Sequence, residues 1–329
     1  MRRATAAAGA GALLLLAGAC DATLGLGLPS TRALEDGAAQ SLNDATSFEM
    51  AGSYTSASTS WTIDMQTTRP NANHVIVGSG SEKVEAIILG DNAYFRGQSF
   101  LAEHMGSDPL SANLVNAAGN AWWKGSAGFV PPLPDLTGGS AFKSTFLGSA
   151  ATSRTDHVSV DGVGAVELAG TRADIFIAAT PPYRLLRVHL GKGVTIDQIS
   201  AADLKYTNYN HDFHLAAPTD VIDFTNLSTL PPVYTVVSVD TSACASPCAV
   251  TAQLKNLGGL SGAIAPSTVT FTMTNASTQQ AIGSCRTPVQ PDVGYNATTT
   301  VGCMISGLSG QQENSAIVTA TADNPGRGS

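Results

Sequence analysis

The fold is decided by residues 48–98, which read FEMAGSYTSASTSWTIDMQTTRPNANHVIVGSGSEKVEAIILGDNAYFRGQ. The hydrophobic pattern in this stretch has a period of two, and turn residues such as Gly78-Ser79-Gly80 separate segments that carry Thr, Val, Ile and Tyr. Strands are expected near residues 48–57, 60–68, 73–79, 83–90 and 93–98. Short strands joined by tight turns predict an antiparallel meander.

Helices and further strands are predicted around this meander. A first helix begins at Ser30 or Thr31. Its apolar stripe comprises Leu34, Ala38, Leu42 and Ala45. Asp108-Pro109 opens a second helix, because proline suits a first helical turn. A weaker helix is expected near residues 136–149, and further strands are expected over 157–190, 203–209 and 211–216.

These elements predict an α+β domain over residues 31–225, in which a curved antiparallel sheet, or half-barrel, wraps around a few helices. Residues 226–232 are expected to form a linker. Residues 233–329 contain few charges and many Thr, Ser, Asn and Gly residues, and alternating segments such as 268–275 recur there. About seven short strands in this length predict a small all-β, immunoglobulin-like sandwich.

Four of the five cysteines lie in the C-terminal part: Cys244, Cys248, Cys285 and Cys303. Four cysteines confined to one part of an exported chain predict two disulfides, and three connectivities are possible. We favour Cys244–Cys248 across a tight turn and Cys285–Cys303 between neighbouring strands. A zinc site is the alternative, but this spacing is not typical of a zinc knuckle.

The N-terminus has the pattern of an export signal. Arg2 and Arg3 precede a small and apolar run that ends Leu16-Ala17-Gly18-Ala19-Cys20. This ending resembles a bacterial lipobox, so residues 1–20 are expected to be a signal peptide whose Cys20 is acylated, for example with palmitate. Residues 21–30 would then be a tether. The alternative is an ordinary signal peptide with a chance cysteine behind it.

Charge and motifs exclude several classes of function. The net charge is −8 and no basic cluster is present, which argues against nucleic-acid binding and against electrostatic docking on anionic lipid. The sequence contains no nucleophile elbow, P-loop or HExxH motif. His211 and His214 are three residues apart and would point to opposite faces of a strand. We therefore expect no enzyme, no cofactor and no metal.

The order of elements over residues 32–225 is similar to the LolA/LolB-like half-barrel of lipoprotein carriers, and especially to the LppX/LprAFG family of actinobacterial lipoproteins. The matching segments are Ala33-Leu34 through Ser41-Leu42, Phe48-Glu49-Met50-Ala51-Gly52, Asp91-Asn92-Ala93-Tyr94-Phe95-Arg96-Gly97, Asn210-His211-Asp212, and Ala217-Pro218 through Asp223. The resemblance implies an open sheet that curls around helices and leaves an apolar cavity for acyl chains. The C-terminal sandwich is not part of the basic family pattern.

A sheet of this size, with a few helices on one face, is expected to enclose an apolar cleft of the kind that binds lipid tails. The candidate lining residues are Leu34, Leu42, Phe48, Ile63, Ile87, Leu89, Tyr94, Leu114, Trp122, Phe142, Phe146, Ile175 and Ile177. The alternative for each of them is an ordinary position in the hydrophobic core.

The sequence therefore predicts an exported lipoprotein, anchored through its acylated N-terminus to the outer face of the cell membrane or, in a diderm, to another envelope membrane. Its partner would be a lipid or glycolipid, which it binds and transfers. The alternative is a non-catalytic scaffold whose immunoglobulin-like domain contacts an envelope protein.

Overall fold

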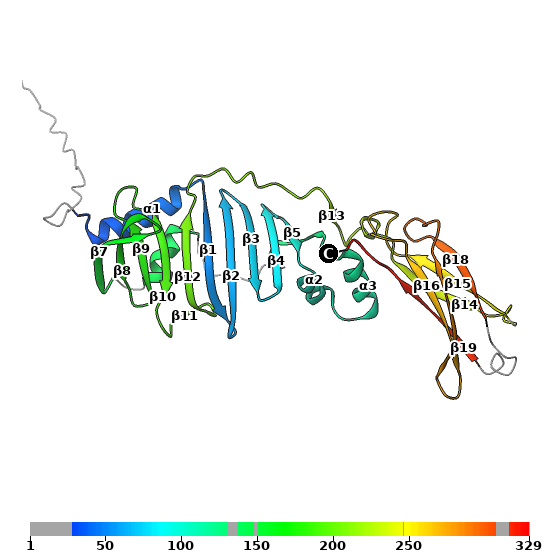
Figure 1. The fold of residues 1–329 in the computed structure, drawn as a ribbon. Helices are drawn as coiled ribbons and strands as arrows, with labels where there is room; N and C mark the ends of the chain where they lie inside the picture. The colour runs from blue at the N-terminus through cyan, green and yellow to red at the C-terminus, as the bar shows by residue number, and fades with distance from the viewer. Residues whose placement is uncertain (1–27, 130–136, 148–150, 246, 307–315, 329) are drawn as a thin grey trace, which may run out of the picture.

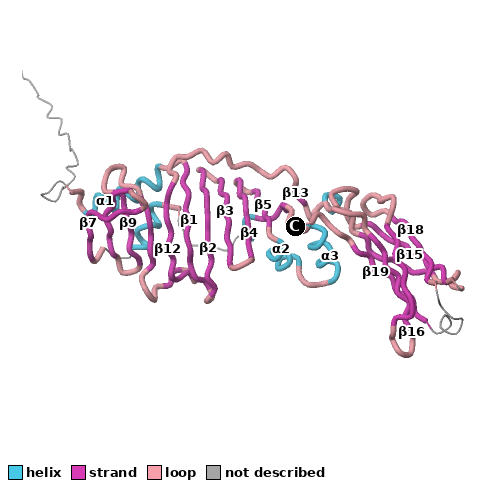
Figure 2. Tube along the Cα trace, in the orientation of Figure 1, coloured by secondary structure: helices cyan, strands magenta, loops and turns pink. Residues whose placement is uncertain are grey.

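The computed structural model describes residues 28–129, 137–147, 151–245, 247–306 and 316–328. The N-terminal part is a large open sheet with a few helices, and the C-terminal part consists of two smaller sheets (Figure 1). An extended segment runs along the large sheet from β12 to β13 and leads into the C-terminal part. The described chain is therefore mostly β-structure (Figure 2).

The large sheet has thirteen described strands, in the order β13-β6-β5-β4-β3-β2-β1-β12-β10-β9-β8-β7, with β11 paired to β12 off this path. Only the short β13 runs parallel to its neighbour, β6, among the described pairs. The strands are β1 (Ser47–Ser56), β2 (Thr59–Thr68), β3 (Ala72–Ser79), β4 (Glu82–Leu89), β5 (Asn92–Arg96), β6 (Trp122–Ser126), β7 (Ser153–Val160), β8 (Val163–Ala169), β9 (Ala173–Ala178), β10 (Leu185–Leu190), β11 (Thr195–Ile196), β12 (Ile199–Thr207) and β13 (Val221–Ile222).

Two predicted helices begin directly after the capping residues that the sequence indicates. Ser30 Oγ accepts a hydrogen bond from Ala33 N (3.1 Å) at the start of α1 (Thr31–Asp44), whose buried residues include Leu34. The Asp108 carboxylate caps α3 (Pro109–Ala118) in the same way. The remaining helical segments are α2 (Gln98–Met105), η1 (Ala127–Phe129), α4 (Gly139–Phe142), η2 (Lys143–Leu147) and η3 (Leu227–Thr229).

The four α-helices that the structure describes pack on the same face of the large sheet, which we call the inner face. Directly opposite residues of an antiparallel pair share a face. Val75 on β3 belongs to the cluster around α1 and α4, and it is opposite Ala86 on β4. Ala86 belongs to the cluster around α2 and α3, and it is opposite Phe95 on β5. Both helical groups therefore cover one continuous face, and the other face is the outer face.

The two small sheets enclose a separate hydrophobic core. One has the order β14-β15-β18 and the other has the order β17-β16-β19. Their strands are β14 (Tyr234–Asp240), β15 (Cys248–Asn256), β16 (Thr268–Asn275), β17 (Ala281–Pro288), β18 (Thr298–Ile305) and β19 (Ala316–Asp323). Leu254 of the first sheet and Phe271 of the second are fully buried in the shared core. The immunoglobulin-like topology stays a prediction.

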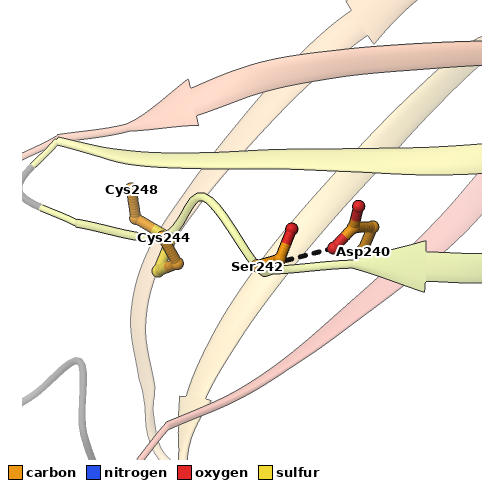
Figure 3. Close-up of a disulfide and its surroundings, with 4 residues drawn as sticks. All are labelled: Asp240, Ser242, Cys244 and Cys248. Atoms are coloured by element: carbon orange, nitrogen blue, oxygen red, sulfur yellow. Dashed lines mark hydrogen bonds between the residues drawn. A yellow bond between two sulfur atoms is a disulfide. The ribbon is translucent and has the colours of Figure 1, made fainter.

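Both favoured disulfides are present. Cys244 and Cys248 close the turn before β15, where Ser242 N also donates to the Asp240 carboxylate (2.8 Å; Figure 3). Cys285 on β17 is bonded to Cys303 on β18, with a Cα–Cα distance of 6.1 Å. These two strands belong to different sheets, so the bond links the two layers rather than two hydrogen-bonded neighbours.

Removal of the inter-sheet disulfide is expected to destabilise the C-terminal part strongly. The double substitution Cys285→Ser with Cys303→Ser should lower the free energy of unfolding by about 3 kcal/mol, because the unfolded chain regains the freedom of a closed loop. Removing Cys244–Cys248 should cost about 2 kcal/mol, since its loop is shorter. Urea unfolding of the three proteins measures both values. Equal losses from the two pairs would contradict the prediction.

Two local predictions differ from the structure. The sequence predicts a strand over residues 211–216, but this segment has no regular secondary structure and no strand partner among the described residues. The reason is that both edges of β1 are already occupied, by β2 on one side and by β12 on the other. The segment that follows β12 therefore cannot pair with β1. The segment Gln98–Met105 is a helix that the sequence pattern did not predict.

The C-terminal tail joins the two parts of the molecule. Arg327 N donates to Ala117 O at the end of α3 (3.1 Å), and its guanidinium donates to Thr229 O (3.0 Å) and to the Asp220 carboxylate. This ion pair holds the pKa of Asp220 below its usual value. The tail thus bonds both to the large-sheet part and to the segment that follows β12.

Candidate functional site: the inner face of the large sheet

The inner face carries an apolar surface from β8 to β6. At one end, α1 and α4 lie over β8, β9, β10, β12, β1 and β2, where Leu168, Ile175 and Leu185 are fully buried. At the other end, α2 and α3 cover Phe95 and Trp123. The central strand β3 connects the two ends through the buried Val75 and the half-buried Val77.

Nine of the thirteen predicted lining residues belong to the two inner clusters. The cluster at the α1 end contains Leu34, Leu42, Phe48, Ile63, Phe142, Phe146, Ile175 and Ile177. The cluster at the α2 and α3 end contains Leu114. The structure therefore brings most of the candidates to one face, from elements far apart in the sequence.

The other four candidates do not reach this face. Ile87 and Leu89 alternate with Ala86 and Ile88 along β4, and it is the latter pair that contacts the inner cluster. Tyr94 is opposite Ile87, so it shares the outer face. Trp122 is half-buried on the outer face, whereas its neighbour Trp123 is 3% exposed in the inner cluster.

Several inner-face residues were absent from the sequence-based set. Met50, Leu204 and Tyr206 are almost fully buried, and β12 places the last two opposite Gly52 and Met50 of β1. The alternation of Ala202, Leu204 and Tyr206 was a usable signal for an inward-facing side of this strand.

The chemistry of the inner face is apolar. Among the buried residues that the structure describes, Glu85 is the only charged one, and its partner Arg96 places it on the outer face. Tyr209 packs against Phe48 with ring centroids 5.9 Å apart, and its hydroxyl donates to Leu185 O (2.8 Å). Burial raises the pKa of Tyr209, so its phenol stays neutral and acts only through hydrogen bonds.

Metal and membrane features were searched over the described residues. They contain no group of three or more His, Cys, Asp or Glu side chains placed to hold a metal ion. No described helix is both long enough and apolar enough to span a bilayer. Cys20, the predicted lipid anchor, lies outside the described residues.

Comparison with solved structures gives distant similarities. No family model and no curated protein matches the sequence. The chain is similar to a crystal structure of MucB in complex with MucA(peri), at 12% identity and a TM-score of 0.30 over 88% of this chain and 98% of that one. A Pseudomonas aeruginosa MucA/MucB complex matches at 14% identity and 0.30, over 86% and 96%. A DUF1329 family protein from Desulfovibrio piger matches at 10% identity and 0.22, over 56% and 95%.

Proposed function

We propose that this protein is an exported, non-catalytic binding protein that holds the acyl chains of a lipid or glycolipid on the inner face of the large sheet. The observation that carries the proposal is the continuity of that face. Uncharged, apolar side chains run from the α1 end through Val75 and Val77 to the α2 and α3 end, on an open sheet. Apolar surface of this kind is what lipid tails bind.

Two further features support the proposal. The two disulfides fit an oxidising compartment outside the cytoplasm. The proposed acylation of Cys20 would keep the binding domain at a membrane surface, where it could take up and deliver lipid. No catalytic step is part of the proposed function.

Native mass spectrometry of the full chain carrying Cys20→Ala tests the proposal directly. This variant has no acylated cysteine, so any acyl species that travels with the folded protein is a bound ligand. The expected result is an adduct of defined mass that organic solvent extracts. A protein that carries no adduct, even after incubation with lipid vesicles, would contradict the proposal.

A matched pair of substitutions on β3 tests which face of the sheet binds the lipid. Val77→Trp adds a large ring to a half-buried inner-face position and should remove most of the bound lipid with little change in melting temperature. Ile76→Trp adds the same ring to the next residue, on the outer face, and should leave the lipid content unchanged. Lipid content and melting temperature are measured on the same preparations. Equal lipid loss in both variants would argue against binding on the inner face.

The second candidate function is a scaffold with a filled interior. It is favoured by the α1 end of the inner face, where Leu34, Phe142 and Ile175 are at most 1% exposed. If the whole face is packed in this way, Val77→Trp overpacks it and costs about 1–3 kcal/mol of stability. A large drop in melting temperature, together with no lipid in the parent protein, supports the scaffold.

A further inference from the structure

The inner face is covered at one end of its strands and open at the other. α1 leads directly into β1, so the end of the helix lies beside the start of that strand (Figure 1). Arg69 bonds to this helix end, through Nε to Ala45 O (3.0 Å) and through Nη2 to Leu42 O (2.8 Å). Phe48, at the start of β1, is fully buried there. This end of the inner face is therefore covered.

At the other end of the same strands the cover is incomplete. Tyr54 is 9% exposed, and Trp61, Val77 and Val84 are half-buried. We call these four residues the mouth of the inner face. Tyr54 is directly opposite Trp61, and Val77 is opposite Val84, so each pair shares a face. Tyr54 belongs to the cluster at the α1 end, and Trp61 and Val77 pack against it, so that face is the inner one.

The side chains change from apolar to polar across the mouth. On the covered side, the neighbouring inner-face residues Ile63, Met65 and Val75 are at most 9% exposed. On the open side, two residues beyond the mouth on β3 and β4, Ser79 is opposite the exposed Glu82. An amphiphilic molecule that enters here therefore meets polar groups first and apolar groups further in.

The mouth carries two hydrogen-bond donors that no described residue engages. Tyr54 Oη and Trp61 Nε1 make no hydrogen bond within the described part of the chain, and neither atom is enclosed. By contrast, the inner-face Tyr209 donates to Leu185 O. Burial raises the pKa of Tyr54, so its hydroxyl stays protonated and can donate. Two neutral donors thus lie where the apolar surface ends.

An acyl lipid has the matching order of groups. Its chain is apolar, and the carbonyl oxygen that joins the chain to the headgroup accepts hydrogen bonds. Tyrosine and tryptophan rings that pack in apolar surroundings need such a partner at their polar ends. An ether-linked alkyl chain is equally apolar but has no carbonyl oxygen, so it would leave both donors without this acceptor. The mouth can therefore distinguish acyl from alkyl chains, whatever the charge of the headgroup.

We propose that the mouth binds the carbonyl end of an acyl lipid and thereby selects ester-linked or amide-linked chains over ether-linked chains. The Tyr54 hydroxyl and Trp61 Nε1 donate to the acyl carbonyl oxygens. The chains extend from the mouth over Ile63, Met65 and Val75, and the headgroup stays outside. This inference rests on the proposed lipid binding by the inner face, and it adds the class of lipid and the direction in which the lipid lies.

Competition between two matched lipids tests the proposal. The vesicles contain equal amounts of dipalmitoylphosphatidylcholine and its ether analogue dihexadecylphosphatidylcholine, which have the same headgroup and chain length. The full chain carrying Cys20→Ala, which is the parent here, is incubated with them. Native mass spectrometry then gives the ratio of the two adducts. The parent should take up the ester lipid in about tenfold preference.

Conservative variants of the mouth should lose this preference. Tyr54→Phe and Trp61→Phe each remove one donor and keep an aromatic ring, so each should lower the ratio to about threefold or less. Trp61 is half-buried, so its variant serves if Tyr54→Phe does not fold. The matched controls are Tyr94→Phe and Trp122→Phe, because these two residues lie on the outer face. Both controls should keep the ratio of the parent.

The outcomes separate this inference from the proposed function. Equal uptake of the two lipids by the parent, or an unchanged ratio in the folded mouth variants, overturns the inference and leaves lipid binding by the inner face intact. A loss of preference in the controls as large as in the mouth variants also overturns it. Uptake of neither lipid overturns both the inference and the proposed function.

Discussion

Replacing Asn256 with alanine is expected to lower the free energy of unfolding by about 4 kcal/mol, because three buried backbone groups and one half-buried group lose their partner. The Asn256 side chain is 0% exposed. Its Oδ1 accepts from Val233 N and Gly258 N (both 2.9 Å), and its Nδ2 donates to Gly259 O (2.9 Å) and Val293 O (2.6 Å). One amide thus satisfies all four of its hydrogen-bonding positions at the start of the C-terminal part.

The matched control for this prediction is Asn275→Ala. Asn275 Oδ1 also accepts two backbone hydrogen bonds, from Ser277 N (2.9 Å) and Thr278 N (3.0 Å), but in an exposed turn where water replaces it. The control should cost less than about 1 kcal/mol. Urea unfolding followed by circular dichroism measures both variants. Similar losses of unfolding free energy in the two variants would mean that burial of the Asn256 hydrogen bonds adds nothing to stability.

Gly52→Ala is expected to destabilise the large sheet by a similar amount, about 4 kcal/mol, because the added methyl group has no room. A Cβ atom at Gly52 would lie 2.0 Å from the backbone oxygen of Asp203 on β12. Neither backbone can yield without breaking the β1–β12 pairing, which joins the β2–β5 meander to β10, β9, β8 and β7. Thermal unfolding gives the loss, and hydrogen exchange of β1 and β12 amides shows where it arises.

Gly164→Ala provides the control for steric space. Gly164 lies on β8 of the same sheet, and a Cβ atom there would have no other atom within 4 Å. Its replacement should leave the melting temperature nearly unchanged, or raise it slightly through the stiffer unfolded chain. An unchanged melting temperature in Gly52→Ala would contradict the prediction. It would mean that β1 and β12 can move apart at this point with no loss of stability.

Local signals explain what could be predicted along the chain. The period of two over residues 48–98 placed β1 to β5, because alternation and turn residues act between near neighbours. The caps at Ser30 and Asp108 placed α1 and α3 for the same reason. The four C-terminal cysteines predicted two disulfides, and the structure has the favoured one of the three possible connectivities.

The candidate site was less accessible from sequence because it depends on which face each strand turns inward. The run Ile87-Ile88-Leu89 and the pair Trp122-Trp123 contain apolar residues at adjacent positions, so their alternation does not say which of them faces the helices. A shift of register by one residue moves every side chain of a strand to the other face. Only the pairing of β4 with β3 and β5 decided that Ile88 faces inward and Ile87 outward.

The sequence by itself determined the strands of the meander, the first and third helices, the four-cysteine pattern and the change of composition after residue 232. The tertiary structure decided that β12 pairs with β1, that β13 lies beside β6, and that Trp123 rather than Trp122 is buried. The physical reason is the range of the interactions. Helix caps, turns and alternation depend on residues a few positions apart. Strand order and face depend on hydrogen bonds between segments far apart in the sequence, such as β1 and β12, where Glu49 is opposite Thr207.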